Sequence, residues 1–112
     1  MSAYTFGDVL LVAFPFTNQS ASKQRPAVVI SSNAYQLERP DLIILAITSQ
    51  VRSPLAFGEA LVHHWQSAGL IKPSVFKPLI TTIETGLVRK VLGSLSINDQ
   101  EQLKQLITKI IG

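Results

Sequence analysis

The stretch "LIILAITSQ", residues 42–50, passes directly from an apolar run to Thr48, Ser49 and Gln50. A short apolar run with β-branched residues is typical of a strand buried in a sheet. Ser and Thr favour strand ends, so these polar residues fit an ordinary turn, and they also bring two hydroxyls to the place where the strand reaches solvent. We predict a buried strand over residues 42–48 that ends in exposed hydroxyl groups.

Other short apolar runs lie on both sides of this strand in the sequence. Residues 8–14 are almost wholly apolar between Gly7 and Pro15, which indicates a second buried strand. Further strands are predicted at residues 27–30, 56–65 and 74–82, with a turn at residues 67–69. One helical turn is predicted within residues 32–41 and another at the start of residues 84–90, before Val91 and Leu92 return to the sheet.

The C-terminal segment carries the clearest helical pattern. Asn98 and Glu101 have the spacing of a capping box, in which the first residue caps the helix and an acid follows three positions later. The apolar residues beyond them recur on one face of a helix: Leu103, Leu106, Ile107, Ile110 and Ile111. Several short strands and a terminal helix that docks on them predict a mainly β fold, built as a small, strongly bent β-barrel or half-barrel.

Length and composition restrict the class of protein. A chain of 112 residues with 46% apolar and 15% charged residues fits one globular domain, residues 1–112. Its apolar runs are far shorter than the roughly 20 residues that cross a bilayer. The start MSAYTFGD has no secretory signal and the chain has no cysteine, which together predict a cytoplasmic protein without disulfides. A net charge of +3 modestly favours a polyanionic partner.

Arg25 lies in "SKQRPAVVISS", residues 22–32, where a polar run meets a proline and then an apolar strand. Pro26 disfavours the α region for the residue before it, so Arg25 should have an extended backbone and a restricted direction. A guanidinium stays protonated at ordinary pH and binds phosphate through two parallel hydrogen bonds. Arg25 is therefore a candidate phosphate ligand, although a surface arginine that pairs with an acid is the commoner case.

Two further segments carry polar groups that suit a phosphate. The hydroxyls of Thr48 and Ser49 can donate to a phosphate oxygen at the end of the apolar strand. In "GLIKPS", residues 69–74, Lys72 and Ser74 flank a proline after a glycine turn, a sequence that also fits a plain rigid loop.

His63 and His64 are candidates for general acid–base catalysis, because histidine titrates near neutral pH. If residues 56–65 form a strand, neighbouring side chains point to opposite faces, so at most one of the histidines faces a given site. The sequence contains no HExxH motif, EF-hand loop, P-loop, GxSxG or GxGxxG. It therefore predicts no dedicated metal site and no cofactor.

Five segments occur in a characteristic order: "GDVLLVAFPF" (7–16), "KQRPAVVIS" (23–31), "LAITSQ" (45–50), "GLIKPS" (69–74) and "TTIETGLVRKVLGSL" (81–95). In this order they resemble the MazF/PemK family of toxin endoribonucleases, which belong to type II toxin–antitoxin systems. The resemblance covers nearly the whole chain, from about Gly7 to the terminal helix.

The resemblance implies an SH3-like barrel of the CcdB/PemK type with a terminal helix, which forms a homodimer. It implies a metal-independent endoribonuclease that cuts single-stranded RNA, including mRNA, at short sequences and leaves a 2′,3′-cyclic phosphate and a 5′-hydroxyl. It further implies growth inhibition, and a labile antitoxin whose acidic, disordered tail occupies the groove of the toxin.

The same resemblance implies the site residues, position by position. The catalytic arginine of the family falls on Arg25, within the Arg25-Pro26 step, and the catalytic threonine falls on Thr48. The loop over residues 17–24 matches the segment that covers substrate in relatives. The residues expected to bind substrate are Phe16, Thr17, Ser22, Lys23, Ser49, Gln50, Lys72 and Ser74. Phe14 fits core packing better than stacking on a base.

The resemblance does not identify the general base. Some family members have an acid and an arginine in the strand before the step that here is Thr82-Ile83-Glu84, whereas this chain has Pro78 and Thr81 there. Arginine holds its proton too tightly to be a good base. The substitutes that stay open are Lys72, Lys77, His64 and Glu84.

Two other functions stay open on this fold. CcdB-type gyrase poisons share the barrel and bind a protein, and they need no Arg25–Thr48 pair. A nuclease-dead module that only sequesters RNA or an antitoxin would bind phosphates as the enzyme does, and only turnover would separate the two.

Overall fold

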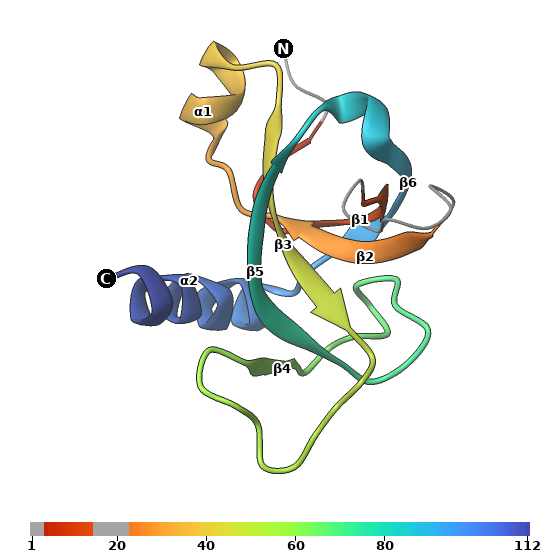
Figure 1. The fold of residues 1–112 in the computed structure, drawn as a ribbon, viewed down its shortest axis with the longest axis vertical. Coiled ribbons are helices and arrows are strands. Elements are labelled where there is room, and N and C mark those ends of the chain that lie inside the picture. Colours follow the sequence, from red (N-terminus) through yellow and green to blue (C-terminus); the bar gives the residue numbers. More distant parts are fainter. Residues whose placement is uncertain (1–3, 15–22) are drawn as a thin grey trace.

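Residues 4–14 and 23–112, described in a computed structural model, form a six-stranded sheet with two α-helices (Figure 1). The strands are β1 (Asp8–Ala13), β2 (Gln24–Val29), β3 (Leu42–Thr48), β4 (Ala60–Val62), β5 (Ser74–Ile83) and β6 (Val88–Ser94). The helices are α1 (Asn33–Glu38), the 3-10 turn η1 (Thr85–Leu87) and α2 (Ile97–Ile111). The predicted class, mainly β with a C-terminal helix, is confirmed. No helix within these ranges is long and apolar enough to span a membrane.

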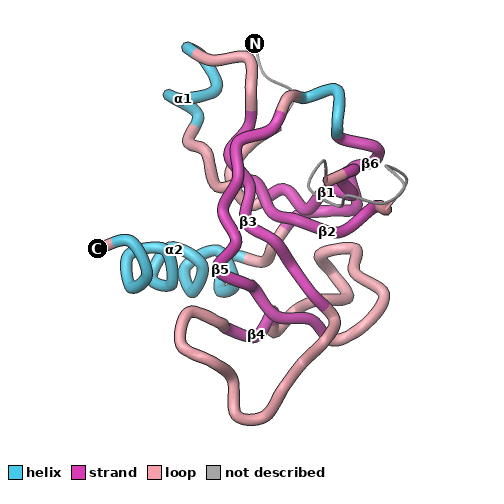
Figure 2. The backbone as a smooth tube through the Cα atoms, in the orientation of Figure 1, coloured by secondary structure: helices cyan, strands magenta, loops and turns pink. Residues whose placement is uncertain are grey.

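The strands follow the order β4-β5-β3-β2-β1-β6 across the sheet, and each neighbouring pair is antiparallel. In Figures 1 and 2, β3 and β5 run along the long axis of the molecule while β1 and β2 cross them, so the sheet is strongly bent. The two edge strands, β4 and β6, do not pair with each other in the part of the chain that the structure describes. The sheet is therefore bent as predicted, but it is not closed into a barrel.

β3 lies inside the sheet, between β5 and β2, and this position explains its unbroken apolar sequence. Adjacent side chains of a strand point to opposite faces. Leu45 and Ile47 pack in a cluster with α2, whereas Leu42, Ile44 and Ala46 pack in a second cluster on the other face. A strand that is covered on both faces needs apolar residues at every position.

β2 begins at Gln24, earlier than the predicted start at residue 27. Arg25 therefore lies inside a strand, with the extended backbone that Pro26 predicts. Pro26 has no N–H to donate to a neighbouring strand. Pairing between β2 and β3 accordingly reaches only as far as Ala27, opposite Ala46, while Arg25 stays paired with β1.

The two predicted helical turns are present as α1 and η1. α1 is capped by Ser32, whose hydroxyl accepts a hydrogen bond from the backbone N–H of Tyr35 at 3.1 Å. β6 begins directly after η1 at Val88, earlier than the predicted return to the sheet at Val91.

α2 packs the predicted apolar stripe against the sheet. Leu103 and Leu106 are buried in the cluster that also contains Leu45, and Ile107 and Ile110 are half-buried against it. Fully burying a side chain of this size contributes roughly 1.5–3 kcal/mol, so the stripe fixes the helix on the sheet. The last residue of the predicted stripe is the exception, because Ile111 is exposed.

The N-terminus of α2 is capped by Ser96, so the predicted cap at Asn98 is wrong. The Ser96 hydroxyl accepts a hydrogen bond from the backbone N–H of Asp99 at 3.1 Å. Ser96 and Asp99 have the same capping-box spacing as Asn98 and Glu101. The earlier start is preferred because it directs Asp99 into the protein, where the side chain is fully buried and has hydrogen-bond partners.

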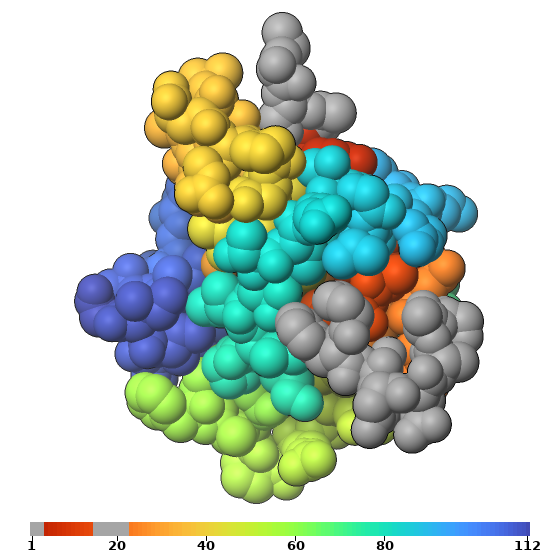
Figure 3. All heavy atoms as spheres, turned by 45° about the horizontal axis from the view of Figure 1, so that its top comes forward, coloured from red at the N-terminus to blue at the C-terminus, as the bar shows by residue number. Residues whose placement is uncertain are grey.

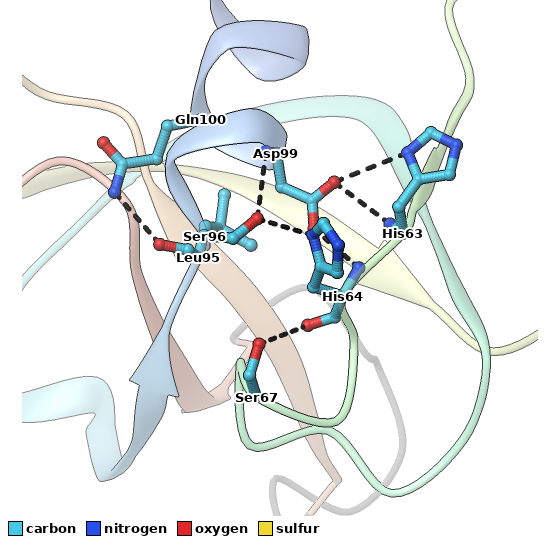
Figure 4. Close-up of polar contacts among 7 residues, drawn as sticks. All are labelled: His63, His64, Ser67, Leu95, Ser96, Asp99 and Gln100. Atoms are coloured by element: carbon cyan, nitrogen blue, oxygen red, sulfur yellow. Dashed lines mark hydrogen bonds and ion pairs between the residues drawn. The ribbon is translucent and has the colours of Figure 1, made fainter.

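The Asp99 carboxylate holds the turn that follows β4 against α2 (Figure 4). It accepts hydrogen bonds from the backbone N–H of His63 at 3.0 Å and of His64 at 2.8 Å. The Nδ1 atoms of the two imidazoles lie 3.5 Å and 3.7 Å from its oxygens, and His64 Nδ1 lies 2.8 Å from the Ser96 hydroxyl. These contacts end the strand at Val62 and put a turn in place of the last part of the predicted strand, whereas residues 56–59 at its other end form a loop. Both histidines lie at one carboxylate, so the prediction that they face opposite sides is wrong.

Asp99→Ala is expected to lower the free energy of unfolding by roughly 2–5 kcal/mol, because it leaves the two histidine amides without their acceptor. Chemical denaturation followed by circular dichroism measures the change. The matched control is Glu101→Ala, which removes an exposed carboxylate from the same helix, 3.8 Å from Lys104, and should have a much smaller effect. Equal losses in the two variants would contradict the role given to Asp99.

The turn after β4 ends at Gly69, where two backbone segments touch. Gly69 has a φ of +87°, and a Cβ there would lie 2.0 Å from the carbonyl oxygen of Leu92 on β6. A Cβ at Gly93 would lie 2.6 Å from the carbonyl oxygen of Ala68. Only glycine fits such a close approach, which fixes the start of the loop formed by residues 70–72.

The segment between β3 and β4 is anchored on the end of α2. The Nζ atom of Lys109 lies 4.9 Å from the centroid of the Phe57 ring, and a Cβ at Gly58 would lie 3.2 Å from Ile110. In the space-filling view of Figure 3, the atoms of this segment, in lime, adjoin those of α2, in dark blue. The segment that begins with Ser49 is therefore held at its other end.

Candidate functional site

A pocket of about 640 Å³ opens where β2 begins and β3 ends. Its wall includes residues 24–26 of β2, residues 46–50 at the end of β3, residues 70–72 of the loop before β5, and parts of β5 itself. Figure 1 shows these segments on the side of the sheet away from the C-terminal end of α2. Segments that are far apart in the sequence thus meet at one site.

Arg25 and Thr48 enter the pocket from neighbouring strands. Ala27 pairs with Ala46, which sets the register of β2 and β3. The pairing of the two strands ends at this pair, and Arg25 and Thr48 each lie two residues beyond it, on the face of the sheet that Ala27 and Ala46 share. Both residues line the pocket.

The hydroxyl of Thr48 is oriented by the turn that follows β3. Its Oγ1 accepts a hydrogen bond from the backbone N–H of Gln50 at 3.1 Å. A hydroxyl that accepts from the backbone keeps its own hydrogen for another acceptor. Thr48 can therefore donate into the pocket, beside the exposed Ser49 and Gln50, which also line it.

The loop before β5 contributes Lys72 and Ser74 in different ways. Lys72 is exposed and lines the pocket. Ser74 also lines it but is buried, and its hydroxyl donates to the carbonyl oxygen of Lys72 at 2.9 Å. Both are predicted substrate ligands, yet the hydroxyl hydrogen of Ser74 is already used within the loop, so this serine holds Lys72 in place.

β5 adds a further cation, Lys77, which lies at an irregularity in its pairing with β3. Two regular pairs flank the irregularity, Phe76 with Ile47 and Ile80 with Leu45. Between them, residues 77–79 of β5 stand opposite Ala46 alone. A bulge of this kind re-aims side chains, and both Lys77 and Leu79 line the pocket. The sequence names Lys77 only among the possible bases, because a bulge leaves no signal in the residue pattern.

The pocket is positively charged. Arg25, Lys72 and Lys77 line it, and its wall contains no aspartate or glutamate among the described residues. Within residues 4–14 and 23–112, none of these cations forms an ion pair. Like charges gathered without a counter-charge repel one another and attract an anion. A ligand of this pocket is therefore expected to be negatively charged.

Small and apolar residues shape the rest of the pocket. Ala46, which faces Ala27 on β2, leaves the space between the longer side chains open. Ile71 and Leu79 line the wall although they are 89% and 45% exposed. Phe14 also lines the pocket but is buried in the second cluster, in keeping with core packing. The pocket thus combines cations with exposed apolar surface.

The described residues include only some of the predicted substrate ligands. Phe16, Thr17 and Ser22 lie outside the described residues. Lys23 is exposed just before β2 and is not part of the wall as far as the structure describes it. Gln24, at the end of the predicted loop, belongs to β2 and lines the pocket, although the sequence does not single it out as a ligand.

The candidate bases divide into two groups. Lys72 and Lys77 line the pocket. Glu84 is exposed after β5, and His64 lies with Ser96 and Asp99 at the start of α2 (Figure 4). Neither of these two belongs to the described wall of the pocket.

A second group of titratable side chains lies at α1. The hydroxyl of Tyr35 donates to the carboxylate of Asp41, which also lies 3.2 Å from the guanidinium of Arg39. The hydrogen bond to Asp41, together with burial, raises the pKa of Tyr35. This group fixes the end of α1 and is not part of the pocket. In the described ranges, no group of three or more His, Cys, Asp or Glu side chains is placed to hold a metal ion.

Solved structures of several toxins and nucleases share this fold. An endoribonuclease in complex with its cognate antitoxin, from a mycobacterial species, gives a TM-score of 0.75 at 16% identity, over 96% of this chain and 95% of that chain. The Mycobacterium tuberculosis toxin MazF-mt6 gives 0.68 at 20% identity, over 89% and 91%. An endoribonuclease from a mycobacterial species gives 0.73 at 16% identity, over 98% and 93%. No curated protein sequence matches the chain significantly.

A family model matches residues 5–111, which include every strand and loop that forms the pocket. The family is described as PemK-like, MazF-like toxin of type II toxin–antitoxin system. The resemblance seen in the five sequence segments is thereby confirmed. The chain belongs to the family of PemK-like, MazF-like toxins of type II toxin–antitoxin systems.

Proposed function

We propose that this toxin is a sequence-specific endoribonuclease that cleaves single-stranded RNA, mRNA included, and inhibits growth in this way. The observation that carries the proposal is the pocket in which Arg25 and Thr48 stand on neighbouring strands beside two lysines. Family membership supports it, since the MazF/PemK resemblance implies RNA cleavage by this arginine and this threonine. Two of the proteins with the same fold are themselves named endoribonucleases.

The reaction begins with attack of a ribose 2′-hydroxyl on the adjacent phosphorus. The bond from O2′ to phosphorus forms and the bond from phosphorus to the 5′-oxygen breaks. A base takes the proton of the 2′-hydroxyl, and an acid gives one to the departing 5′-oxygen. The products are a 2′,3′-cyclic phosphate and a 5′-hydroxyl. Because the nucleophile belongs to the RNA, EDTA is expected to leave the reaction intact.

Arg25 and Thr48 stabilise the transition state of this reaction. Negative charge builds on the non-bridging oxygens as phosphorus gains its fifth bond. The guanidinium of Arg25 can bind two of these oxygens at once, and Arg25 is also the proposed donor to the 5′-oxygen. The Thr48 hydroxyl adds a donor from the next strand, because Gln50 occupies only its acceptor side. Donors placed in advance at the developing charge usually make the largest contribution to the rate.

The apolar part of the wall favours RNA over a small phosphate as the ligand. Ile71 and Leu79 are large apolar side chains left exposed beside cations. Single-stranded RNA offers both charged phosphates and flat bases that can be splayed apart and packed against such side chains. A ligand with both properties accounts for both kinds of surface.

Incubation of the purified protein with a long unstructured RNA, in the presence of EDTA, tests the proposal. We expect cuts at a recurring short sequence, with a cyclic phosphate and a 5′-hydroxyl identified by mapping both new ends. Intact RNA that the protein does not bind would contradict the nuclease and favour a CcdB-like gyrase poison. RNA that is bound but never cut would favour a module that only sequesters RNA or the antitoxin.

The acidic, disordered tail of a cognate antitoxin is proposed to bind in the same pocket. The cations of the wall, which lack a carboxylate partner among the described residues, suit an acidic segment. One similar structure is an endoribonuclease in complex with its cognate antitoxin. A saturating tail peptide should displace a fluorescent RNA, which anisotropy measures. Binding of both at once would show that the tail lies elsewhere.

A homodimer and a cytoplasmic location also stay predictions. The dimer follows from the family resemblance, and the location from the sequence, which has no cysteine. Sedimentation at micromolar concentration should give twice the mass of one chain, and a monomer alone would count against the dimer. Fractionation of expressing cells tests the location.

A further inference from the structure

We infer that Lys77 forms a second phosphate subsite in the pocket, which binds the phosphate next to the scissile one in a single-stranded RNA. The inference rests on the proposed function, since it leaves the scissile phosphate to Arg25 and Thr48. Its support comes from the position of Lys77 on the pocket face of β5, from the place of β3 between two cations, and from the charge of the pocket.

Alternation along β5 directs Lys77 into the pocket, and the bulge adds Leu79 beside it. Phe76, directly before it, is fully buried in the cluster that packs against α2, so alternation along the strand directs Lys77 to the opposite face. Pro78 returns to the face of Phe76, where it lies beside Gly58 in the segment between β3 and β4. Lys77 and Leu79 therefore share the pocket face opposite Ala46, where regular pairing would place a single residue.

Arg25 and Lys77 stand on either side of β3. The order of the strands here is β5-β3-β2, with Thr48 at the end of the middle strand. Paired strands lie about 4.8 Å apart, so β5 and β2 are separated by about 10 Å where both pair with β3. Two long side chains across this distance can hold successive phosphates of one RNA strand, with the Thr48 hydroxyl beside the first.

The charge of the pocket also fits more than one phosphate. Each phosphodiester carries one negative charge, whereas the wall carries the cations Arg25, Lys72 and Lys77 and no carboxylate among the described residues. Lys77 has no ion pair within residues 4–14 and 23–112, so these parts of the protein leave its ammonium free. One bound phosphate would leave most of this charge unbalanced, and the next phosphate along the strand would balance Lys77.

The salt dependence of RNA binding tests the subsite. The probe is a short unstructured RNA with 2′-O-methyl groups throughout, which binds but cannot be cleaved through its 2′-oxygens. For Lys77→Ala, the slope of log Kd against log salt concentration should fall by about 0.7, the value for one lost phosphate contact with a single strand. Lys77→Arg should keep the slope of the wild type. So should the matched control Lys90→Ala, which removes an exposed lysine of β6 outside the described wall.

A neutral linkage identifies the phosphate that Lys77 binds. Once the cleaved step is mapped, a methylphosphonate replaces the phosphate on one side of it or on the other. At one of these two positions, the methylphosphonate should weaken binding by the wild type to the affinity that Lys77→Ala has for the unmodified RNA. The same methylphosphonate should not weaken binding by Lys77→Ala any further. If the methylphosphonate at either position weakened RNA binding by the wild type and by Lys77→Ala to the same degree, the inference would be overturned.

The outcomes separate this inference from the proposed function. A protein that binds RNA without cutting it would contradict the nuclease, and the salt slope of Lys77→Ala would still decide the subsite. A protein that cuts RNA but shows the same slope for Lys77→Ala as for Lys90→Ala would overturn the subsite and leave the nuclease intact. Lys77 is exposed, so its replacement should leave the fold unchanged, which thermal unfolding checks.

Discussion

Arg25→Ala is expected to slow RNA cleavage by about 10²–10³-fold, the usual loss when one donor to a transition-state charge is removed. The reason is the position of Arg25 at the start of β2, where it lines the same pocket as Thr48 and has no acidic partner in the described residues. Single-turnover cleavage of an RNA that carries the mapped site measures the loss. Because Arg25 is exposed, the variant should unfold at the same temperature as the wild type.

Two further variants separate the charge of Arg25 from its geometry. Arg25→Lys keeps the charge but loses the two parallel hydrogen bonds, so its rate should lie between those of the wild type and Arg25→Ala. Arg89→Ala is the matched control, since Arg89 is an exposed arginine of β6 that donates to the carbonyl oxygen of Gly86. If Arg25→Ala cut RNA as fast as Arg89→Ala, Arg25 would have no place in the chemistry.

Thr48→Val should slow cleavage by a similar factor, about 10²-fold or more. Valine has the shape of threonine, so the variant removes the hydroxyl and leaves the volume of the side chain unchanged. It removes both the donor to the phosphate and the acceptor that Gln50 uses in the turn. The loss should appear in the rate of the chemical step rather than in the affinity for RNA.

Thr48→Ser tests whether the hydroxyl itself is needed. Serine keeps the donor and the bond to Gln50, so cleavage should recover most of the wild-type rate. Thr82→Val is the control for the exchange of threonine by valine, since Thr82 is an exposed residue of β5 outside the described wall of the pocket. Comparable activity of Thr48→Val and Thr82→Val would rule out a catalytic hydroxyl at residue 48.

Elements with strong patterns were predictable from the sequence. The unbroken apolar run of β3 predicts its bounds correctly, because both of its faces are covered. The stripe that begins with Leu103 predicts α2 and the face that it buries. In both cases most residues of the pattern are buried or half-buried, with Ile111 as the exposed exception, so local sequence and final structure agree.

Elements that depend on distant contacts were not predictable in the same way. Asn98 and Ser96 are both acceptable caps, and the choice between them depends on Asp99, which binds the backbone of residues 63 and 64. The same contacts end β4 at Val62. The open edges of the sheet follow from pairings that join distant segments, which residue patterns do not encode.

The site was predictable where a motif carries it and not elsewhere. The arginine–proline step places Arg25 correctly in an extended backbone, and the polar end of β3 brings Thr48 to the same pocket. Lys77 lies on the pocket face of β5, which only the pairing of β5 with β3 reveals. Ser74 has the residue type of a ligand, but its hydroxyl is used to hold the loop of Lys72.

The fold and the pocket are connected through the loop that carries Lys72. Asp99 fixes the turn after β4, and Gly69 fixes the point where the turn becomes the loop. Ser74 fixes the far end of the loop through the carbonyl oxygen of Lys72. Asp99 and Gly69, which are not part of the described wall, thus help to determine where one of the cations of the pocket lies.

The central claim is that RNA binds in the pocket between β2, β3 and β5. The measurement that tests it most directly is a titration of isotope-labelled protein with a 2′-O-methylated RNA that carries the cleaved sequence, followed by amide chemical shifts. The largest changes should fall on the amides of Arg25, Thr48 and Lys72, with α1 unaffected. Changes confined to α1 or to the free edge of β6, with the pocket amides unmoved, would contradict the claim.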